Sequence, residues 1–267
     1  MAHDREYGAA GQLGLAVPPA NLTVEPEMAM LLPAGVSLHT TRLGSASPSP
    51  RQRLLDYVRN LDGAIESFRG APLEALMFAC TGSSYLIGRE AEGKLVAALS
   101  DARGVPVITA ANAVLQTLRT LGSERIALVT PYPDWLTREA CRYWDAAGLQ
   151  IAAIETVPIG SEDTRAIYGL RSATAIEALG RLSPAGADAI LLSGTGMPTL
   201  RAIKWAAETI GIPVLSSNLC LAWQVLDLLG VGPAPGVKAW AGHGWGDFVR
   251  AWLERVQPPE APRGGKL

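Results

Sequence analysis

The sequence contains few of the residues that build disulfide frameworks or metal sites. Its 267 residues include three cysteines, far apart and odd in number, and three histidines. Disulfide bonds are therefore not expected, and a reducing cytoplasm is the expected location. No Cys and His residues stand at the spacing of metal ligands, so the sequence predicts no metal site.

Charge of one sign and long apolar runs are also scarce. The formal net charge is -2 and no long run of like charges occurs, so nothing indicates binding to nucleic acid or to an anionic membrane. No apolar stretch approaches the roughly 20 residues that span a bilayer, and the N-terminal residues lack the pattern of a secretory signal. The 48% hydrophobic content is typical of a globular protein with one large α/β domain or two lobes.

Short apolar runs alternate with helical patterns along the chain. Strands are expected at residues 13–17, 36–42, 75–79, 106–109, 125–130, 149–157, 189–193 and 213–217. Helices are expected at 51–68, 85–99, 112–121, from about 134, and at 198–210 and 218–229. This alternation predicts an α/β fold with parallel sheets covered on both faces. Residues 1–11 and 257–267 are expected to be disordered.

Two parts of the chain follow the same order. In the first, ALMFA leads to Cys80-Thr81-Gly82, a helix, a Pro-Val strand and a helix opened by Asn112. In the second, AILLS leads to Gly194-Thr195-Gly196, a helix, a Pro-Val strand and a helix opened by Asn218. Such self-similarity predicts two related lobes, although common α/β loops can also resemble each other by chance. The expected first lobe is 12–122, completed by a helix near 218–230, and the second is 123–217.

The two strand–helix junctions have the chemistry of an anion site. In an open α/β sheet, ligands bind beyond the carboxyl ends of the strands, where helix starts offer unpaired N–H groups. Glycine lets the backbone approach a ligand, and Thr or Ser hydroxyls add donors. Cys80 is the first residue of one junction, where a thiol is expected to gain thiolate character. The alternative is a small buried residue that closes a strand.

Other candidates carry less information. Tyr132, in VTPYPDW, directly follows a strand and can point into the same cleft. Asn21 follows the first strand, as a site residue or as the residue of an Asx turn before a helix. Cys141 and Cys220 are interpreted as packing residues. The aromatic, glycine-rich segment 240–247 receives no role.

Five segments together resemble the aspartate/glutamate racemase superfamily, most closely the branch of arylmalonate decarboxylase and maleate cis–trans isomerase. They are VPPANLTVEPE, ACTGSS, VTPYPDW, DAILLSGTGMPTL and GIPVLSSNLCLAW, which span about residues 12 to 230. The resemblance implies two pseudo-symmetric lobes, each a four-stranded parallel sheet flanked by helices, with the active site in the cleft between them. It also implies chemistry without a cofactor, on a small carboxylate or dicarboxylate, through an enediolate or a cysteine adduct. A homodimer is compatible with this resemblance.

The resemblance assigns roles residue by residue. Asn21, Cys80 and Tyr132 match positions that, in the isomerase, bind substrate, supply the nucleophilic cysteine and bind a carboxylate. Thr81, Gly82 and Tyr132 also fall on the segment that forms the dioxyanion hole of the decarboxylase, facing a wall at 194–196. The expected substrate-binding residues are Asn21, Thr81, Gly82, Ser83, Tyr132, Gly194, Thr195 and Gly196. Cys80 is the expected catalytic residue.

The cysteine pattern departs from these relatives. Racemases and the maleate isomerase place a second cysteine where this chain has Gly194. Arylmalonate decarboxylase keeps a single cysteine on the second lobe and a glycine on the first. This chain has the mirror arrangement, with Cys80 on the first lobe and Gly194 on the second.

One thiol limits the reactions that the resemblance allows. Racemisation by two bases needs a group on each face of the α-carbon, so it is disfavoured. Decarboxylation needs donors for an enediolate and one acid, which Cys80 can supply. Isomerisation needs a nucleophile that adds to a double bond, and Cys80 could add. Because residue 194 is glycine, no residue is assigned to generate the thiolate of Cys80 or to protonate the adduct. We expect a decarboxylase, with a maleate isomerase-like enzyme and a non-catalytic carboxylate-binding protein as alternatives.

Overall fold

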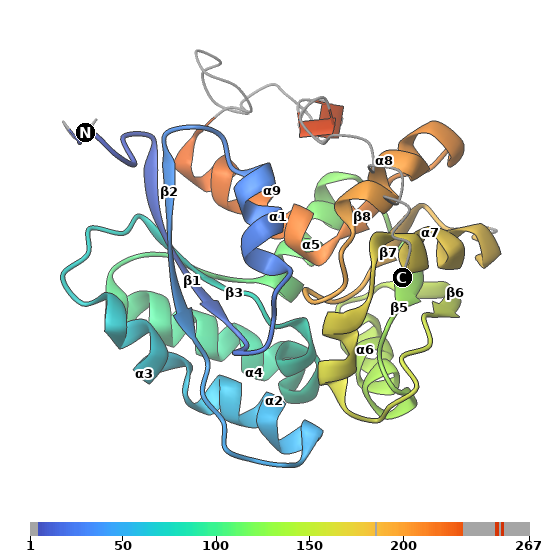
Figure 1. The fold of residues 1–267 in the computed structure, drawn as a ribbon, viewed down its shortest axis with the longest axis horizontal. Helices are drawn as coiled ribbons and strands as arrows, with labels where there is room; N and C mark the ends of the chain where they lie inside the picture. The colour runs from blue at the N-terminus through green and yellow to red at the C-terminus, as the bar shows by residue number, and fades with distance from the viewer. Residues whose placement is uncertain (1–4, 185, 232–248, 251, 254–267) are drawn as a thin grey trace, which may run out of the picture.

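The computed structural model describes residues 5–184, 186–231, 249–250 and 252–253, which form two four-stranded parallel sheets side by side (Figure 1). The first sheet has the order β2-β1-β3-β4, and the second has the matching order β6-β5-β7-β8. The strands of the first sheet are β1 (Gly11–Val17), β2 (Val36–Arg42), β3 (Ala75–Phe78) and β4 (Val107–Thr109). Those of the second are β5 (Arg125–Thr130), β6 (Gln150–Thr156), β7 (Ala189–Leu192) and β8 (Val214–Ser216). The predicted fold class is confirmed.

Helices cover the sheets and fill the space between them. They are α1 (Val24–Leu31), α2 (Pro50–Arg59), α3 (Leu61–Ile65), α4 (Thr81–Arg103), α5 (Ala110–Thr120), α6 (Asp134–Ala146), α7 (Ser172–Arg181), α8 (Leu200–Thr209) and α9 (Ser217–Leu229), with 3-10 helices η1 (Glu66–Phe68) and η2 (Thr164–Gly169). In Figure 1, α2 to α4 lie with the first sheet, α6 to α8 lie with the second, and α1, α5 and α9 gather in the middle of the view. Helix α9 packs against α5 and α1, the contact expected of a helix that completes the first lobe.

The burial of each strand explains how clearly the sequence predicts it. The inner strands β3 and β7 are buried along their whole length, as a parallel sheet covered on both faces requires. The edge strands β2 and β6 are partly exposed, and their sequences accordingly mix polar and apolar residues. None of the helices in the described ranges has both the length and the apolar character to cross a bilayer.

Several helix boundaries differ from the predictions. The helix expected at 51–68 is interrupted at Asn60, where φ is -91° and ψ is 1°. The helix expected at 85–99 begins at Thr81 and reaches Arg103, with a kink at Gly88, where φ is 77° and ψ is 166°. The apolar pattern assigns no helix to α7 or η2, which the structure contains. Residues 1–4, 240–247 and 257–267 lie outside the described residues.

The helices after β4 and β8 begin slightly earlier than predicted. The Thr109 hydroxyl caps α5 by accepting a 3.0 Å bond from the Asn112 N–H, and the Ser216 hydroxyl caps α9 by accepting a 3.2 Å bond from the Leu219 N–H. Asn112 and Asn218 therefore lie within the first helical turn rather than opening the helix. The equivalent caps add to the likeness of the two lobes.

Candidate active site

A small pocket of about 30 Å³ lies at the carboxyl ends of the inner strands of both sheets. Cys80, Tyr132 and Gly194 each stand two residues beyond the end of a strand, namely β3, β5 and β7. The pocket is lined by Pro18, Leu54, Cys80, Thr81, Gly82, Tyr132, Leu136, Thr164, Ile167, Tyr168, Gly194, Thr195 and Gly196. Seven of the nine predicted site residues are in this lining, while Asn21 and Ser83 lie outside it.

The Cys80 thiol is held in a defined hydrogen-bonded position. Its sulfur lies 3.1 Å from the Ser83 hydroxyl, which donates its own proton to the Leu54 carbonyl over 2.7 Å. Because a hydroxyl has one proton, Ser83 acts as the acceptor and Cys80 as the donor. Burial raises the pKa of the Cys80 thiol, against the opposing effect of bonds from Ser83 and from the Gly82 N–H. The thiolate character expected at a helix start is thus outweighed by burial, and the thiol is neutral.

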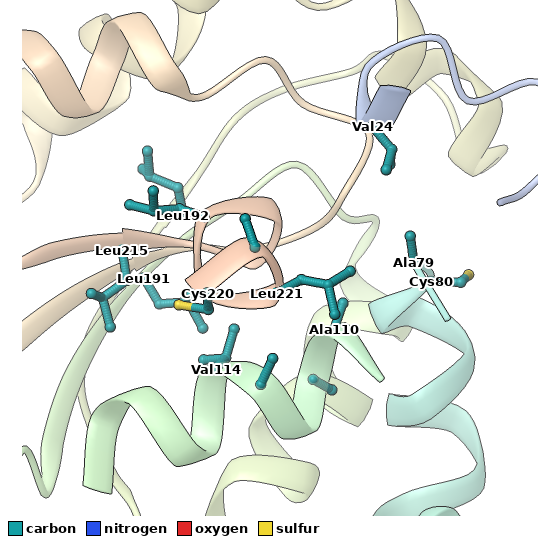
Figure 2. Packing of buried hydrophobic residues seen from close by; sticks show 14 of the residues in the cluster. Val24, Ala79, Cys80, Ala110, Val114, Leu191, Leu192, Leu215, Cys220 and Leu221 are labelled. Carbon is teal, nitrogen blue, oxygen red and sulfur yellow. The ribbon is translucent and has the colours of Figure 1, made fainter. Parts of the chain in front are cut away.

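The other two cysteines lie away from the pocket. Figure 2 shows the Cys220 sulfur among buried side chains that include Leu191 and Val114, whereas the Cys80 sulfur points away from the labelled residues. Cys220 has 0% exposure, and burial raises its pKa to about 12. Cys141 is half-buried on α6 and packs against the core. The interpretation of Cys141 and Cys220 as packing residues is confirmed.

Hydroxyl groups and a helix start form the first-lobe wall, which consists of Cys80, Thr81 and Gly82. The Thr81 hydroxyl lies 2.7 Å from the Tyr132 hydroxyl, which reaches across from the second lobe. Burial raises the pKa of Tyr132 far above its usual value, so the phenol is a neutral donor. The N–H groups at the start of α4 adjoin these hydroxyls, and together they suit a carboxylate or an enediolate.

Glycine forms most of the second-lobe wall, which consists of Gly194, Thr195 and Gly196. Gly194 has a φ of +100°, a conformation that favours glycine. Its N–H donates to the Ser217 hydroxyl over 3.2 Å. The Thr195 hydroxyl donates to the Ala79 carbonyl over 2.9 Å, directly beside the first-lobe wall. The Thr195 bond holds the second-lobe wall beside the first-lobe wall.

The expectation of a second helix start facing the ligand is wrong. Helix α8 begins at Leu200, and the N–H groups of Thr199 and Leu200 donate to one carboxylate oxygen of Glu27 over 2.6 and 3.2 Å. The Asn218 amide donates to the other oxygen over 2.7 Å. Glu27, from α1, thus occupies the helix end that a substrate was expected to use. Burial raises the pKa of Glu27, whereas the bonds it accepts lower it.

Asn21 lies outside the pocket lining and contacts the second-lobe wall. Its carbonyl oxygen accepts bonds from the N–H groups of Thr23 and Val24 over 2.9 and 3.2 Å, the expected Asx turn. Its amide donates to the Thr195 hydroxyl over 3.2 Å. In this structure the side chain therefore positions Thr195, and its contact with a substrate stays a prediction.

Sequence reasoning missed the segment that covers the pocket. This cap segment, residues 163–169, comprises Asp163 and η2, and supplies Thr164, Ile167 and Tyr168 to the lining. Asp163 caps η2 by accepting the Arg165 N–H over 2.9 Å, and it forms an ion pair with the buried Arg53 of the first lobe. The Asp-Thr-Arg order is a helix-start signal, but it does not reveal what the short helix covers.

The described ranges contain no group of three His, Cys, Asp or Glu side chains placed to hold a metal ion. The pocket lining consists instead of one thiol, hydroxyls, glycines and apolar side chains. This arrangement can bind a carboxylate at the first-lobe wall and present an S–H group beside it.

Known proteins are similar to this chain over most of its length. The family model described as arylmalonate decarboxylase matches residues 13–239. Arylmalonate decarboxylase of Bordetella bronchiseptica is 30% identical over 240 residues, which cover 87% of this chain and 94% of that protein.

Two solved structures share the fold. One is a Nocardia farcinica maleate cis–trans isomerase, a cysteine-to-serine mutant with a covalently bound succinylcysteine intermediate. It has a TM-score of 0.75 and 25% identity, and covers 91% of this chain and 98% of its own. The other is an arylmalonate decarboxylase in the liganded form, with one glycine changed to cysteine and one cysteine changed to serine. Its TM-score is 0.69 at 25% identity, with coverage of 88% of this chain and 97% of its own.

Proposed function

Because the chain belongs to the arylmalonate decarboxylase family, we propose that it decarboxylates a small malonate-type diacid, with Cys80 as the proton donor. One carboxylate of the substrate binds the hydroxyls of Thr81 and Tyr132 at the start of α4. The other lies against apolar side chains such as Leu54, Leu136 and Ile167, which stabilise a carboxylate less than water does.

The proposed reaction needs one acid and no base. The bond between the α-carbon and the apolar-side carboxylate breaks, and carbon dioxide leaves. The electron pair stays on the substrate as an enediolate, whose oxygens accept bonds from the Thr81 and Tyr132 hydroxyls. The Cys80 S–H then donates its proton to the α-carbon, and the resulting thiolate regains a proton from solvent.

The observation that carries this proposal is a single neutral thiol opposite a glycine wall. Cys80 donates its proton to Ser83 and is the one cysteine in the pocket lining, while Gly194 and Gly196 face it from the second lobe. A neutral thiol is suited to protonate a carbanion, and one thiol protonates one face. We therefore expect a single product enantiomer, formed from the face opposite to that used by arylmalonate decarboxylase. The decarboxylase variant that gained a cysteine and lost one supports the compatibility of this fold with relocated cysteines.

A maleate isomerase-like reaction is the second candidate. The similar isomerase carries a succinylcysteine intermediate, which supports a nucleophilic cysteine in proteins of this fold. In this chain, Cys80 would add to the double bond as a thiolate, and rotation about the resulting single bond would precede its elimination. Burial raises the pKa of Cys80, which favours the thiol over the thiolate and therefore favours decarboxylation.

The test is a substrate panel of aryl- and alkylmalonates and maleate, with wild type, Cys80→Ala and the control Cys141→Ala. Cys141 lies on α6, outside the pocket, so its removal should leave turnover unchanged. Decarboxylation predicts carbon dioxide release and one enantiomer, with a loss of about 10²–10⁴-fold in Cys80→Ala. Fumarate and a Cys80 adduct in intact-protein mass spectra would support the isomerase instead. If wild type and Cys80→Ala both bind a diacid and neither forms a product, the protein is a non-catalytic carboxylate-binding protein.

A further inference from the structure

The pocket must change shape to admit any diacid. Its volume of about 30 Å³ has room for roughly two water molecules. A malonate with two carboxylates and an α-substituent is larger, so its binding has to displace part of the lining. The lining side chain that is displaced most easily therefore determines the size of the substrate that the site accepts.

Hydrogen bonds and core packing hold most of the lining in place. The Thr81 and Tyr132 hydroxyls lie 2.7 Å apart, and the Thr195 hydroxyl donates to a backbone carbonyl of the first lobe over 2.9 Å. Leu136 and Ile167 are 0% and 4% exposed and belong to the hydrophobic core. Displacing one of these side chains would break a buried hydrogen bond or leave a cavity in the core.

Tyr168 has neither kind of attachment. It belongs to η2 in the cap segment and is half-buried. Within the described part of the chain, its hydroxyl makes no hydrogen bond. Its ring lies directly on the second-lobe wall, because a Cβ on Gly196 would stand 2.6 and 2.9 Å from two of the ring carbons. Tyr168 is therefore the large side chain of the lining that a ligand can displace at the least cost.

The Tyr168 ring fills the part of the pocket that is left for the α-substituents of a substrate. The proposed binding mode places one carboxylate at the first-lobe wall and the other against Leu54, Leu136 and Ile167. The lining that remains is the second-lobe wall with the Tyr168 ring over it. A methyl or vinyl group requires a small shift of this ring, whereas a phenyl group requires the space that the ring itself fills.

We propose that Tyr168 is a specificity-determining residue that restricts the substrate to malonates with small alkyl or alkenyl α-substituents. This inference rests on the proposed decarboxylation, and it adds the substrate class of that site. Such substrates are smaller than the arylmalonates after which the family is named. A larger group has to displace the Tyr168 ring from Gly196, which lowers the kcat/KM of its malonate relative to that of a small one.

Two matched diacids test the proposal, α-methyl-α-vinylmalonate and α-methyl-α-phenylmalonate. Vinyl and phenyl groups both delocalise the negative charge of an enediolate, so the two diacids differ mainly in size. We expect the kcat/KM of wild type, measured by carbon dioxide release, to favour the vinyl diacid by at least about tenfold. Tyr168→Ala should raise kcat/KM for the phenyl diacid by about 10–100-fold and reduce the preference to less than about threefold.

Further variants separate the size of the ring from other effects of substitution. Tyr168→Phe keeps the ring without the hydroxyl and should keep the wild-type preference. Tyr168→Leu should give an intermediate preference, and it supplies the measurement if Tyr168→Ala does not fold. Asp163→Asn is the matched control for a loosened cap, because it breaks the ion pair with Arg53 and leaves the ring unchanged. It should raise KM for both diacids without changing their ratio of kcat/KM.

The outcomes distinguish the role of Tyr168 from the proposed function. A preference that does not change in Tyr168→Ala would overturn the inference, as would a wild-type kcat/KM for the phenyl diacid that equals or exceeds that for the vinyl diacid. In both cases carbon dioxide release would still support the proposed function. A preference that falls equally in Asp163→Asn would mean that the cap as a whole, and not Tyr168, limits the substrate. If neither wild type nor any variant releases carbon dioxide from a malonate, the proposed function fails, and the role assigned to Tyr168 fails with it.

Discussion

Gly194 lies so close to Tyr132 that a Cβ on the glycine would stand 2.9 Å from the phenol oxygen. The φ of +100° adds conformational strain to any side chain at this position. With this backbone conformation, a thiol at position 194 would displace Tyr132. In this chain, the donor hydroxyl of Tyr132 and a second-lobe cysteine therefore compete for one space.

Gly194→Ala should lose both stability and turnover. The strained backbone should cost about 1–3 kcal/mol of unfolding free energy, and the displaced Tyr132 should reduce kcat by about 10²-fold or more. Gly122→Ala is the control, because Gly122 also has a positive φ, of +65°, but a Cβ there meets nothing within 4 Å. Chemical denaturation and steady-state kinetics of both variants check this. Similar kcat values for the two would contradict the proposed contact with Tyr132.

The pH dependence of turnover should identify the protonation state that Cys80 uses. As a proton donor, Cys80 must be a thiol, and burial raises its pKa, so the thiol persists to higher pH than in a free cysteine. We expect kcat/KM to be level through neutral pH and to fall only above about pH 8.5, the usual pKa of cysteine. A thiolate nucleophile predicts the opposite slope, with turnover that increases as pH rises through that pKa.

Ser83→Ala should move this alkaline limit to higher pH. When Cys80 ionises, the Ser83 hydroxyl can turn its proton from the Leu54 carbonyl to the thiolate, and this bond lowers the pKa of Cys80. Removal of the hydroxyl should therefore raise that pKa further. Ser84→Ala is the matched control, because the neighbouring Ser84 hydroxyl is buried and has no hydrogen-bond partner among the described residues. A limit that moves equally in both variants, or that moves to lower pH in Ser83→Ala, would mean that Ser83 does not stabilise the Cys80 thiolate.

The cap segment should depend on the ion pair between Arg53 and Asp163. The Arg53 side chain is 6% exposed, and it also donates to the Pro48 carbonyl over 2.8 Å. Asp163→Asn keeps an oxygen to cap η2 but removes the charge that faces Arg53. We expect a loss of about 1–3 kcal/mol, below the 3–5 kcal/mol of a fully buried pair because Asp163 is partly exposed. KM should rise as well, because the cap carries Tyr168 over the pocket.

A second inter-lobe ion pair provides the control for the cap. Arg51 on α2 pairs with Glu139 on α6 at 3.2 Å, but the Arg51 side chain is 54% exposed. Glu139→Gln should therefore cost less than about 1 kcal/mol and leave KM unchanged. Thermal denaturation and substrate titration of the two variants give the comparison. Equal effects on KM would mean that Asp163 does not act through the cap.

Local patterns in the sequence predicted the two sheets and most of the residues that line the pocket. They could do so because strands and strand–helix junctions depend on residues that are neighbours in the chain. Buried strands followed by Cys80 and by Gly194 already indicate where two sheet edges place their loops. Features set by distant contacts were not accessible in this way. The start of α8 is occupied by Glu27, 172 residues before Thr199, and the cap is held by Arg53, 110 residues before Asp163. The protonation state of Cys80 likewise depends on burial by both lobes.

Glu27 should be essential for stability because it joins α1 to the start of α8. Its carboxylate is 3% exposed and accepts bonds from Thr199, Leu200 and Asn218. Glu27→Ala would leave these donors unpaired, at a cost on the order of 3 kcal/mol. Glu27→Gln should cost about 1 kcal/mol, because one amide oxygen can still serve the two backbone donors.

The pH dependence of Glu27→Gln tests whether burial raises the pKa of Glu27. A raised pKa means that the native protein binds the proton of Glu27 more tightly than the unfolded chain does. The contribution of this proton to the free energy of unfolding therefore grows as pH falls toward the usual value of 4.5. It is lost as pH rises through the raised pKa. The glutamine variant cannot titrate there, so its stability deficit relative to wild type should widen with acidification. Glu25→Gln, which breaks only the exposed pair with Arg42, should show no such widening. Urea denaturation at neutral and mildly acidic pH measures the deficit. A deficit that narrows on acidification would mean that the hydrogen bonds to Glu27, rather than its burial, determine the pKa of its carboxylate.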